Sequence, residues 1–304
     1  METSGARPSR RAVLAAGAGA ALTGMSLGGT AYAAPARQEG ILRELRALEG
    51  EHAARLGVYA RNTATGRTVR YRADELFPMC SLFKTLAVAA VLRDKDRDGE
   101  FLAKRIHYTQ QEVTDSGYGP VTGLPENLAA GMTVGELCAA TICQSDNAAG
   151  NLLLRELGGP GAITGFCRSV GDGVTRLDRW EPALNSAEPD RVTDTTSPHA
   201  IGRTYERLAL GGALAPGDRA LLRGWLLANT TSKERFRKGL PADWVLADKT
   251  GGGKYGTNND TGITWPPGRA PIVMAVLTTK HLPDAAADNP LVAKTAALLA
   301  AALA

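Results

Sequence analysis

Apolar and polar residues follow two different periods along this chain of 304 residues. A two-residue alternation predicts β-strands whose side chains point alternately to opposite faces. Near the beginning, two such runs flank a short turn containing glycine, which predicts a β-hairpin. Toward the end, three more runs predict three further strands. The five predicted strands cover 56–62, 67–72, 244–249, 261–265 and 272–278.

Between these runs, the apolar residues recur at three- and four-residue spacings, which predicts amphipathic helices. The helix beginning near 133 carries Thr133 and Glu136 at the spacing of a capping box, in which each side chain bonds the backbone of the other residue. The predicted helices cover 40–54, 133–144, 148–157, 198–210, 217–229 and 289–304.

The order of these elements predicts a two-lobed α/β (α+β) fold. Because the strands lie at both ends of the chain, the two ends must meet to complete one antiparallel sheet. We expect a sheet lobe with flanking helices from about 37–76 and 226–304, and an all-helical lobe from about 77–225. No long Gly/Ser linker divides the sequence, so one compact unit is expected.

Residues 1–33 have the pattern of a cleavable export signal. Arg10 and Arg11 precede a Gly/Ala-rich apolar stretch that ends in the small–x–small sequence Ala31-Tyr32-Ala33. The paired arginines fit the twin-arginine type. Because glycines dilute its hydrophobicity, we favour a cleaved signal over a membrane anchor. The expected mature domain is 34–304, exported to an extracytoplasmic location, a monomer, and without stable membrane insertion after cleavage.

The charge balance argues against nucleic acid as a partner. The net charge is +4, and removal of the signal, with three arginines and one glutamate, lowers it to +2. The four histidines have no metal-ligand spacing. Asp94 begins a stretch like a calcium loop, but Arg105 stands where the bidentate acid is needed. We therefore expect no metal. The four cysteines show no spacing that argues for a disulfide, so buried free thiols are expected.

Ser81 and Lys84 are the first candidates for chemistry. The helical pattern of apolar residues begins at Ser81, which places the Ser81 and Lys84 side chains on one face of the first helical turn. A serine hydroxyl is a weak nucleophile that needs a base and donors for the oxyanion. Burial would disfavour a charged lysine and make Lys84 a plausible base. Alone, the pair is better explained by a helix cap at Ser81 and a surface charge at Lys84.

Three further segments add polar residues. Ser145-Asp146-Asn147 forms a turn between two apolar helices, where side chains can enter a cleft. Residues 172–198 form a long loop without periodicity, a length that is usually functional. Its ends carry Arg179 and Asp194, opposite charges that could clamp its neck. A predicted strand runs into Lys249-Thr250-Gly251, where glycines let a substrate lie close to the sheet edge.

Taken together, Ser81-x-x-Lys84, Ser145-Asp146-Asn147 and Lys249-Thr250-Gly251 resemble the class A serine β-lactamases. Glu181-x-x-x-Asn185 in the long loop matches the class A pattern in particular. The resemblance extends over the whole mature chain. It implies hydrolysis of the β-lactam amide bond of penicillins and cephalosporins, antibiotic resistance, and no cofactor.

The resemblance also implies roles in acyl transfer at matching positions. Ser81 would be acylated, Lys84 and Glu181 would share base duty, and Ser145 would relay a proton to the departing nitrogen. Backbone N–H groups of Ser81 and Gly252 would form the oxyanion hole. Glu181 and Asn185 would hold the water that hydrolyses the acyl-enzyme, and the Glu181–Pro182 bond is implied to be cis.

The resemblance implies a substrate-binding set as well. Asn147 would hold the side-chain amide of the substrate, and Tyr118 would form an aromatic wall. Lys249, Thr250 and Gly251 would bind the carboxylate on the second ring. The arginine that many relatives carry after this strand is replaced by Asn258, so we expect Arg235 to supply the charge. Arg237 is expected to pair with Asp248 instead.

Two alternatives share the short motifs. A penicillin-binding D,D-peptidase has no need of the Glu181–Asn185 water site. A non-hydrolysing β-lactam sensor should lack that base and carry a membrane segment. In some relatives a cysteine at the Gly253 position pairs with the one at Cys80 and accompanies carbapenem hydrolysis, and its absence here gives no support to that activity.

Overall fold

The computed structural model describes residues 33–304, with side chains from Gln38 onward. The predicted export signal therefore lies outside the described residues, apart from Ala33. Among the helices that are described, none combines the length and the apolar character needed to cross a membrane.

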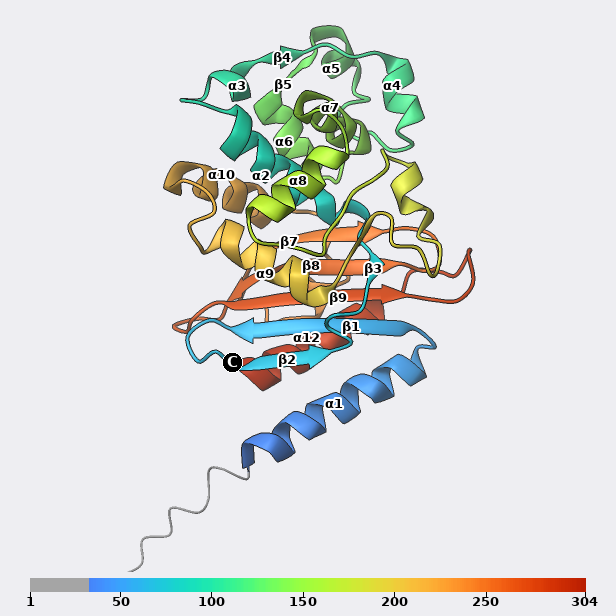
Figure 1. The fold of residues 1–304 in the computed structure, drawn as a ribbon, viewed down its shortest axis with the longest axis vertical. Helices are drawn as coiled ribbons and strands as arrows, with labels where there is room; N and C mark the ends of the chain where they lie inside the picture. Colours follow the sequence, from blue (N-terminus) through green and yellow to red (C-terminus); the bar gives the residue numbers. More distant parts are fainter. Residues whose placement is uncertain (1–32) are drawn as a thin grey trace, which may run out of the picture. The chain divides into compact units, whose positions relative to one another are not determined.

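A five-stranded antiparallel sheet, in the order β2-β1-β9-β8-β7, forms the centre of the fold (Figure 1). Strand β1 pairs with β9 from Arg55 opposite Thr279 to Asn62 opposite Ile272, which joins the beginning of the domain to its end. The predicted mixed fold with one sheet built from both parts of the chain is confirmed. The strands are β1 (Arg55–Asn62), β2 (Thr68–Tyr71), β7 (Val245–Gly252), β8 (Asn258–Trp265) and β9 (Ile272–Thr279).

Two short strand pairs lie within the helical part. Strand β3 (Phe77–Pro78) pairs with β6 (Thr195–Thr196), and β4 (Arg105–Ile106) pairs with β5 (Met132–Thr133). The first pair ties the end of the long loop to the segment that precedes Ser81.

The helices agree with the apolar spacing in most places. The predicted capping box forms at α6, with Thr133 as its N-cap. The described helices are α1 (Ala33–Glu51), α2 (Phe83–Ala90), α3 (Glu100–Ala103), α4 (Gln110–Asp115), α5 (Pro125–Ala130), α6 (Val134–Cys143), α7 (Asn147–Leu157), α8 (Gly161–Ser169), α9 (Pro198–Ala209), α10 (Pro216–Leu227), α11 (Phe236–Gly239) and α12 (Asn289–Leu303), with the shorter turns η1 (Cys80–Leu82), η2 (Val91–Lys95) and η3 (Ala183–Ser186).

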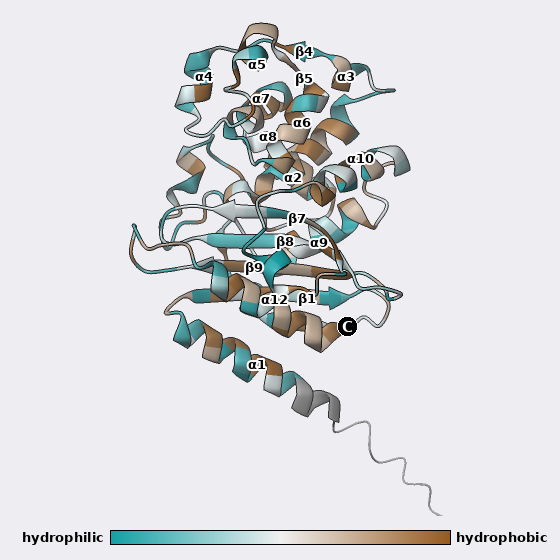
Figure 2. Cartoon of the chain, turned by 180° about the vertical axis from the view of Figure 1, so that it is seen from behind, coloured by the Kyte–Doolittle hydropathy of each residue, from teal (hydrophilic) through white to brown (hydrophobic). Residues whose placement is uncertain are grey.

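Helices cover both faces of the sheet. Helix α9 lies on one face, and α12 lies on the other with its hydrophobic side toward the strands (Figures 1 and 2). A Cβ on Gly202 of α9 would lie 2.7 Å from the Tyr59 ring, so this close approach of helix and strand requires glycine. Burial of apolar area on both faces is the main force that holds these layers together.

Helix α2 runs through the centre of the helical part. All eight of its residues are buried, including Lys84. This burial explains a sequence that is apolar on every side. The short turn η1 precedes α2 and packs against β7. The turn η1, with Ser81, therefore lies between the beginning of α2 and the edge of the sheet.

Several sequence-based boundaries were wrong. The first helix runs from Ala33 to Glu51 rather than over 40–54, and β7 continues to Gly252 rather than ending at 249. Ser81 lies in a 3₁₀ turn, and the α-helix begins two residues later at Phe83. Strand β8 begins at Asn258 rather than at 261. Its first three residues are polar and all buried, so no alternation marks them, although they pair with β7.

Candidate active site

Contacts on both sides fix the segment that carries Ser81. The Met79 N–H donates to the Asp194 carbonyl at 2.9 Å. The Asn259 side chain donates to the Pro78 carbonyl at 2.9 Å, and the Tyr205 hydroxyl donates to the Leu82 carbonyl at 3.1 Å. The long loop, the sheet and α9 thus hold the backbone of this turn, in which Ser81 is 7 % exposed.

The Lys84 amine lies at the centre of a polar cluster. It donates to the Ser145 carbonyl at 2.7 Å and to Asn147 Oδ1 at 2.6 Å, and it lies 3.2 Å from Glu181 Oε1. Burial lowers the pKa of Lys84, while the Glu181 carboxylate acts in the opposite direction. An ammonium has three protons, and four acceptor atoms surround this one, the fourth being the Ser145 hydroxyl at 3.3 Å, so we infer a charged Lys84 in the free protein.

The Ser145 hydroxyl lies between two lysines. It accepts from Lys84 Nζ at 3.3 Å and from Lys249 Nζ at 2.9 Å. Both lone pairs of this oxygen are thereby engaged, so its own proton is free to point into the cleft. Ser145 has a φ of 58°, a left-handed backbone conformation that a turn between α6 and α7 requires. This geometry leaves the Ser145 hydroxyl able to donate its proton to a group that binds beside it.

Glu181 is buried and oriented at both oxygens. Its Oε1 accepts from the Ser81 hydroxyl at 3.4 Å, and its Oε2 accepts from the Asn185 amide. The Glu181–Pro182 bond is cis, as expected. The Asn151 side chain donates to the Glu181 carbonyl at 2.9 Å and accepts from the Glu181 N–H at 3.0 Å.

The predicted clamp at the neck of the long loop is present. Arg179 and Asp194 form an ion pair at 2.5 Å, and Asp194 is 1 % exposed. Backbone N–H groups of Asp178 and Arg179 also donate to the Asp194 carboxylate, at 2.8 and 2.9 Å. The loop that carries Glu181 is therefore closed by charge-assisted bonds, which are among the stronger hydrogen bonds.

Asn147 and Tyr118 lie beside each other at one wall. The Asn147 N–H donates to the Tyr118 carbonyl at 2.8 Å, and its side-chain amide donates to the Ser116 carbonyl at 3.1 Å. Tyr118 is 51 % exposed, so its ring is available to a ligand. The Asp146 carboxylate accepts from the Val121 and Thr122 N–H groups and joins this wall to the Ser145 turn.

The end of β7 forms the opposite wall. Lys249 is fully buried and also donates to the Thr250 carbonyl at 3.0 Å. Burial, followed by the positive charges of Lys84 and Arg235, lowers the pKa of Lys249 well below its ordinary value. A Cβ on Gly251 would lie 2.9 Å from the Met79 carbonyl, so glycine permits the close approach of η1.

Arg235 immediately precedes α11, and its side chain extends to the end of β7. Its Nη1 donates to the carbonyls of Gly251 at 3.0 Å and Asn259 at 2.8 Å. Its Nη2 lies 3.9 Å from the position of a Cβ on Gly252, the exposed end of the strand. Asn258 is fully buried and donates to Asn289, so it provides no charge.

The expected pairing of Arg237 with Asp248 is wrong. Arg237 donates to the carbonyls of Leu227 and Leu246 at 3.3 and 3.1 Å, and no ion pair joins it to Asp248 within the described chain. The Arg237 side chain is exposed, whereas Asp248 is fully buried. Asp248 instead hydrogen-bonds the Asn229 amide at 3.0 Å and the Asp260 carboxyl group.

Asp248 and Asp260 form a buried carboxyl pair beneath β7. Asp248 also hydrogen-bonds the Ser232 side chain, and a proton on one of the two carboxyl groups allows Asp248 and Asp260 to hydrogen-bond each other. Burial, followed by the charge of Asp248, raises the pKa of Asp260 well above its ordinary value, while Arg235 acts in the opposite direction. A Cβ on Gly262 would lie 2.7 Å from the Asp248 Cβ, so glycine makes room for the pair.

Replacement of Asp260 by asparagine is expected to stabilise the protein increasingly as pH rises. An unfolded aspartate loses its proton near pH 4, whereas folded Asp260 keeps it, so folding takes up a proton and stability falls with rising pH. The amide of asparagine can donate to Asp248 and accept from the Phe236 N–H without that proton. Thermal unfolding of both proteins from pH 4 to pH 8 measures the difference.

The difference in melting temperature between Asp260→Asn and the parent should be smallest at pH 4. It should stop growing at the pH where Asp260 ionises in the folded parent. A difference that is constant over this range would show that Asp260 is not protonated. Asp260→Ala serves as the control. It removes the acceptor of the Phe236 N–H and is expected to destabilise the protein throughout.

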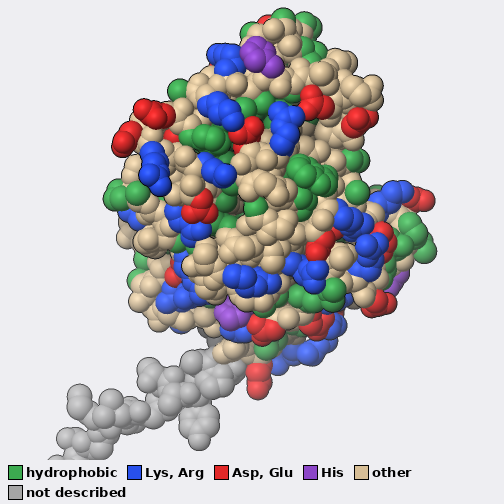
Figure 3. Space-filling view, turned by 45° about the horizontal axis from the view of Figure 1, so that its top comes forward, with side chains coloured by type: hydrophobic (Ala, Val, Ile, Leu, Met, Phe, Trp, Pro, Cys, Tyr) green, Lys and Arg blue, Asp and Glu red, His purple; other side chains and the backbone are tan. Residues whose placement is uncertain are grey.

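All four cysteines are buried free thiols, as the sequence predicts. A Cβ on Gly253 would lie 2.9 Å from the Cys80 sulfur, so the two positions are neighbours. The part of the chain that the structure describes holds no cluster of three or more residues able to bind a metal ion. On the face drawn in Figure 3, basic and acidic side chains are interspersed, without a continuous basic surface.

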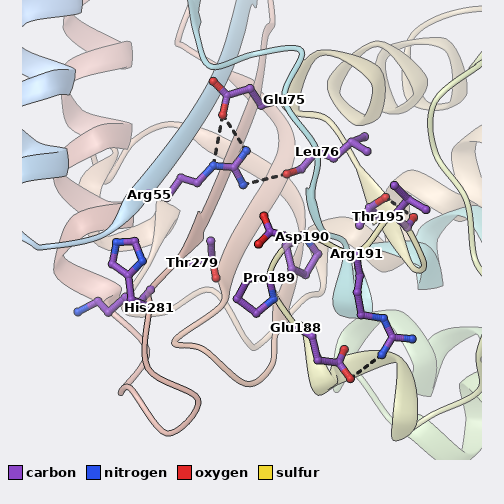
Figure 4. Close-up of a pocket in the computed structure, with 14 residues that line it drawn as sticks. Arg55, Glu75, Leu76, Glu188, Pro189, Asp190, Arg191, Thr195, Thr279 and His281 are labelled. Carbon is purple, nitrogen blue, oxygen red and sulfur yellow. Dashed lines mark hydrogen bonds and ion pairs between the residues drawn. The ribbon is translucent and has the colours of Figure 1, made fainter.

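A separate cavity of about 640 Å³ lies between the second half of the long loop and the end of β9 (Figure 4). None of the candidate catalytic residues lines it. Charged groups on its wall pair with one another, as Arg55 does with Glu75 and Arg191 with Glu188. It is therefore distinct from the cluster around Lys84.

Sequence reasoning missed several residues that organise the site. Asn151 and Asn259 anchor Glu181 and the Ser81 segment, and Asn229 and Thr231 lie beneath Thr250. Each is a polar residue whose partners come from distant segments. Asn229 and Asn259 are buried and Asn151 and Thr231 are half-buried, which the sequence alone does not reveal, so no sequence signal identified them.

Comparisons with known proteins agree with this geometry. A model of the β-lactamase enzyme family matches residues 41–303. The β-lactamase of Streptomyces lavendulae is 77 % identical over 304 residues and covers all of both chains. That of Streptomyces fradiae is 68 % identical over 304 residues, 100 % of this chain and 99 % of its own.

Solved structures show the same likeness. The β-lactamase from Streptomyces albus G superimposes with a TM-score of 0.87 at 67 % identity, covering 87 % of this chain and 100 % of its own. An ancestral class A β-lactamase superimposes with a TM-score of 0.81 at 51 % identity, covering 86 % and 99 %. With the match in family, fold and length, this chain belongs to the class A β-lactamases.

Proposed function

We propose that the protein hydrolyses the amide bond of β-lactam antibiotics through an acyl-enzyme on Ser81. The observation that carries this proposal is the placement of Glu181, whose two oxygens accept from Ser81 and Asn185. The same carboxylate can therefore act as a base first for the Ser81 hydroxyl and later for a water molecule. Acyl transfer to water needs both services.

In the first step, the Ser81 oxygen attacks the lactam carbonyl carbon. Because Lys84 is charged in the free protein, the Ser81 proton passes to Glu181, either directly or through Lys84, which gives Glu181 one of its own protons and takes that of Ser81. N–H groups of Ser81 and Gly252 bind the oxyanion that forms. The C–N bond then breaks, and Ser145 gives its proton to the departing nitrogen. Lys84 returns a proton to Ser145 and takes one from Glu181, which becomes a carboxylate again. The two lysine donors on Ser145 support this role, because they engage its lone pairs and favour release of a proton.

In the second step, a water molecule between Glu181 and Asn185 attacks the ester. Glu181 takes the proton of the water, the C–O bond to Ser81 breaks, and the Ser81 oxygen receives that proton from Glu181. The burial of Glu181, at 4 % exposed, supports a base shielded from bulk solvent. This step separates a hydrolase from a D,D-peptidase or a sensor, and neither alternative accounts for the orientation of Glu181.

The substrate lies between two walls in this proposal. Asn147 and Tyr118 hold the acylamino side chain, and Lys249, Thr250 and Gly251 bind the carboxylate with help from Arg235. Absorbance of a chromogenic cephalosporin incubated with purified residues 34–304 tests the activity. Catalytic ring opening is expected. Stoichiometric binding without turnover, or cleavage of D-Ala-D-Ala peptides alone, would contradict the proposal.

Loss of Arg235 is expected to lower kcat/KM for penicillins roughly ten- to hundredfold. Its guanidinium is held by two carbonyls at the strand edge and leaves Nη2 directed toward Gly252. Steady-state kinetics of Arg235→Ala with several carboxylate-bearing lactams measure the effect. Arg237→Ala is the matched control, and it should retain parental kinetics. Equal kinetics in Arg235→Ala and the parent would remove Arg235 from the carboxylate site.

We further propose that the mature enzyme acts outside the cytoplasm and protects its producer from β-lactams. The pattern of residues 1–33 supports export.

A further inference from the structure

Two threonine hydroxyl groups meet beneath the end of β7. Thr231 Oγ1 lies 2.5 Å from Thr250 Oγ1, and either oxygen could be the donor. Thr231 Oγ1 also lies 2.7 Å from Asn229 Oδ1. Thr250 is 4 % exposed, and within residues 38–304 its hydroxyl has no other hydrogen-bond partner.

The orientation of Asn229 is fixed by its neighbours. The Thr231 N–H donates to Asn229 Oδ1 at 3.0 Å, and a backbone N–H can only donate. The other end of the amide therefore presents its NH₂ group to Asp248, at 3.0 Å. Beyond Asn229, the carboxyl pair of Asp248 and Asp260 completes this chain of hydrogen bonds. Asn229 thus offers Thr231 an acceptor and no donor.

The hydroxyl protons in this chain of hydrogen bonds can be counted. Each threonine hydroxyl has one proton. Without substrate, Thr231 donates to Asn229 and Thr250 donates to Thr231, so every proton is used inside the protein. In that arrangement, Thr250 has no proton for an incoming carboxylate, which accepts hydrogen bonds and cannot donate them.

We propose that Thr231 is a positioning residue that turns its hydroxyl from Asn229 to Thr250 when substrate binds. This inference rests on the proposed function, in which Thr250 contacts the substrate carboxylate. The rotation lets Thr250 accept from Thr231 and donate to the carboxylate. It costs little, because Asn229 Oδ1 keeps its hydrogen bond from the Thr231 N–H. Only hydrogen bonds change in this rotation, and no covalent bond forms or breaks.

Valine at position 231 tests the switch, since it keeps the shape of threonine and removes the hydroxyl. We expect kcat/KM for a penicillin to fall roughly three- to tenfold, mostly through KM, because the lost hydrogen bond acts equally before and in the transition state. Thr231→Ser should restore parental values. Thr230→Val is the matched control. Its hydroxyl donates only to the Cys143 carbonyl, and its kinetics should remain parental.

A double-mutant cycle separates the switch from a general structural effect. In a Thr250→Val background, Thr231→Val should cause no further loss, because the acceptor of the switched proton is gone. An equal loss in both backgrounds, or parental kinetics in Thr231→Val, would overturn the inference. If the parent protein does not turn over penicillin at all, the proposed function fails, and that result is distinguishable from failure of the switch alone.

Discussion

Replacement of Ser81 by alanine is expected to reduce penicillin turnover by about 10⁴-fold or more and to abolish covalent labelling. Loss of the nucleophile leaves no route to the acyl-enzyme, because no other hydroxyl among the described residues combines a hydrogen bond to Glu181 with a place in the turn η1 before α2. Steady-state hydrolysis and labelling by a fluorescent penicillin measure the two effects. Circular dichroism checks that the fold is retained.

A control variant should behave differently. Ser169 lies at the end of α8, where its hydroxyl donates to the Phe166 carbonyl at 2.7 Å. Ser169→Ala is therefore expected to keep parental turnover and labelling. Labelling of Ser81→Ala at the parental rate would exclude Ser81 as the nucleophile.

Replacement of Glu181 by alanine is expected to slow deacylation by about 10²–10⁴-fold, the usual contribution of a general base. Acylation should continue, more slowly, because Lys84 remains beside the site and loses the partner that favours its charged form. Rapid mixing with penicillin should therefore give a stoichiometric burst followed by almost no turnover.

Another carboxylate of the same loop provides the control. Glu188 pairs with Arg191 at 2.7 Å and lies in the wall of the separate cavity. Glu188→Ala should show steady turnover at nearly the parental rate. Unchanged deacylation in Glu181→Ala would assign the water to a different base.

Local patterns predicted the elements whose causes are local. The capping box of Thr133 and Glu136, and the alternation of β1 and β2, depend on neighbours a few residues apart. The 3₁₀ turn at Ser81 was not predictable in this way. It depends on hydrogen bonds from Asn259 and to Asp194, which the sequence places more than 100 residues away.

The same distinction between local and distant causes applies to the candidate site. The short motifs and the charged ends of the long loop were visible in the sequence, and the Arg179–Asp194 ion pair was predicted. The pair of Asp248 and Asp260 was not, because it depends on the register of β7 against β8, with Thr250 opposite Asp260. That omission led to the incorrect pairing of Arg237 with Asp248.

The most direct test of an acyl-enzyme mechanism is time-resolved intact-mass spectrometry of the parent and Glu181→Ala after mixing with penicillin, followed by peptide mapping of the adduct. We expect a transient penicilloyl mass in the parent and a persistent one in Glu181→Ala, both on the peptide that contains Ser81. An adduct on another residue, or hydrolysis by the parent while Glu181→Ala never accumulates an adduct, would contradict the mechanism.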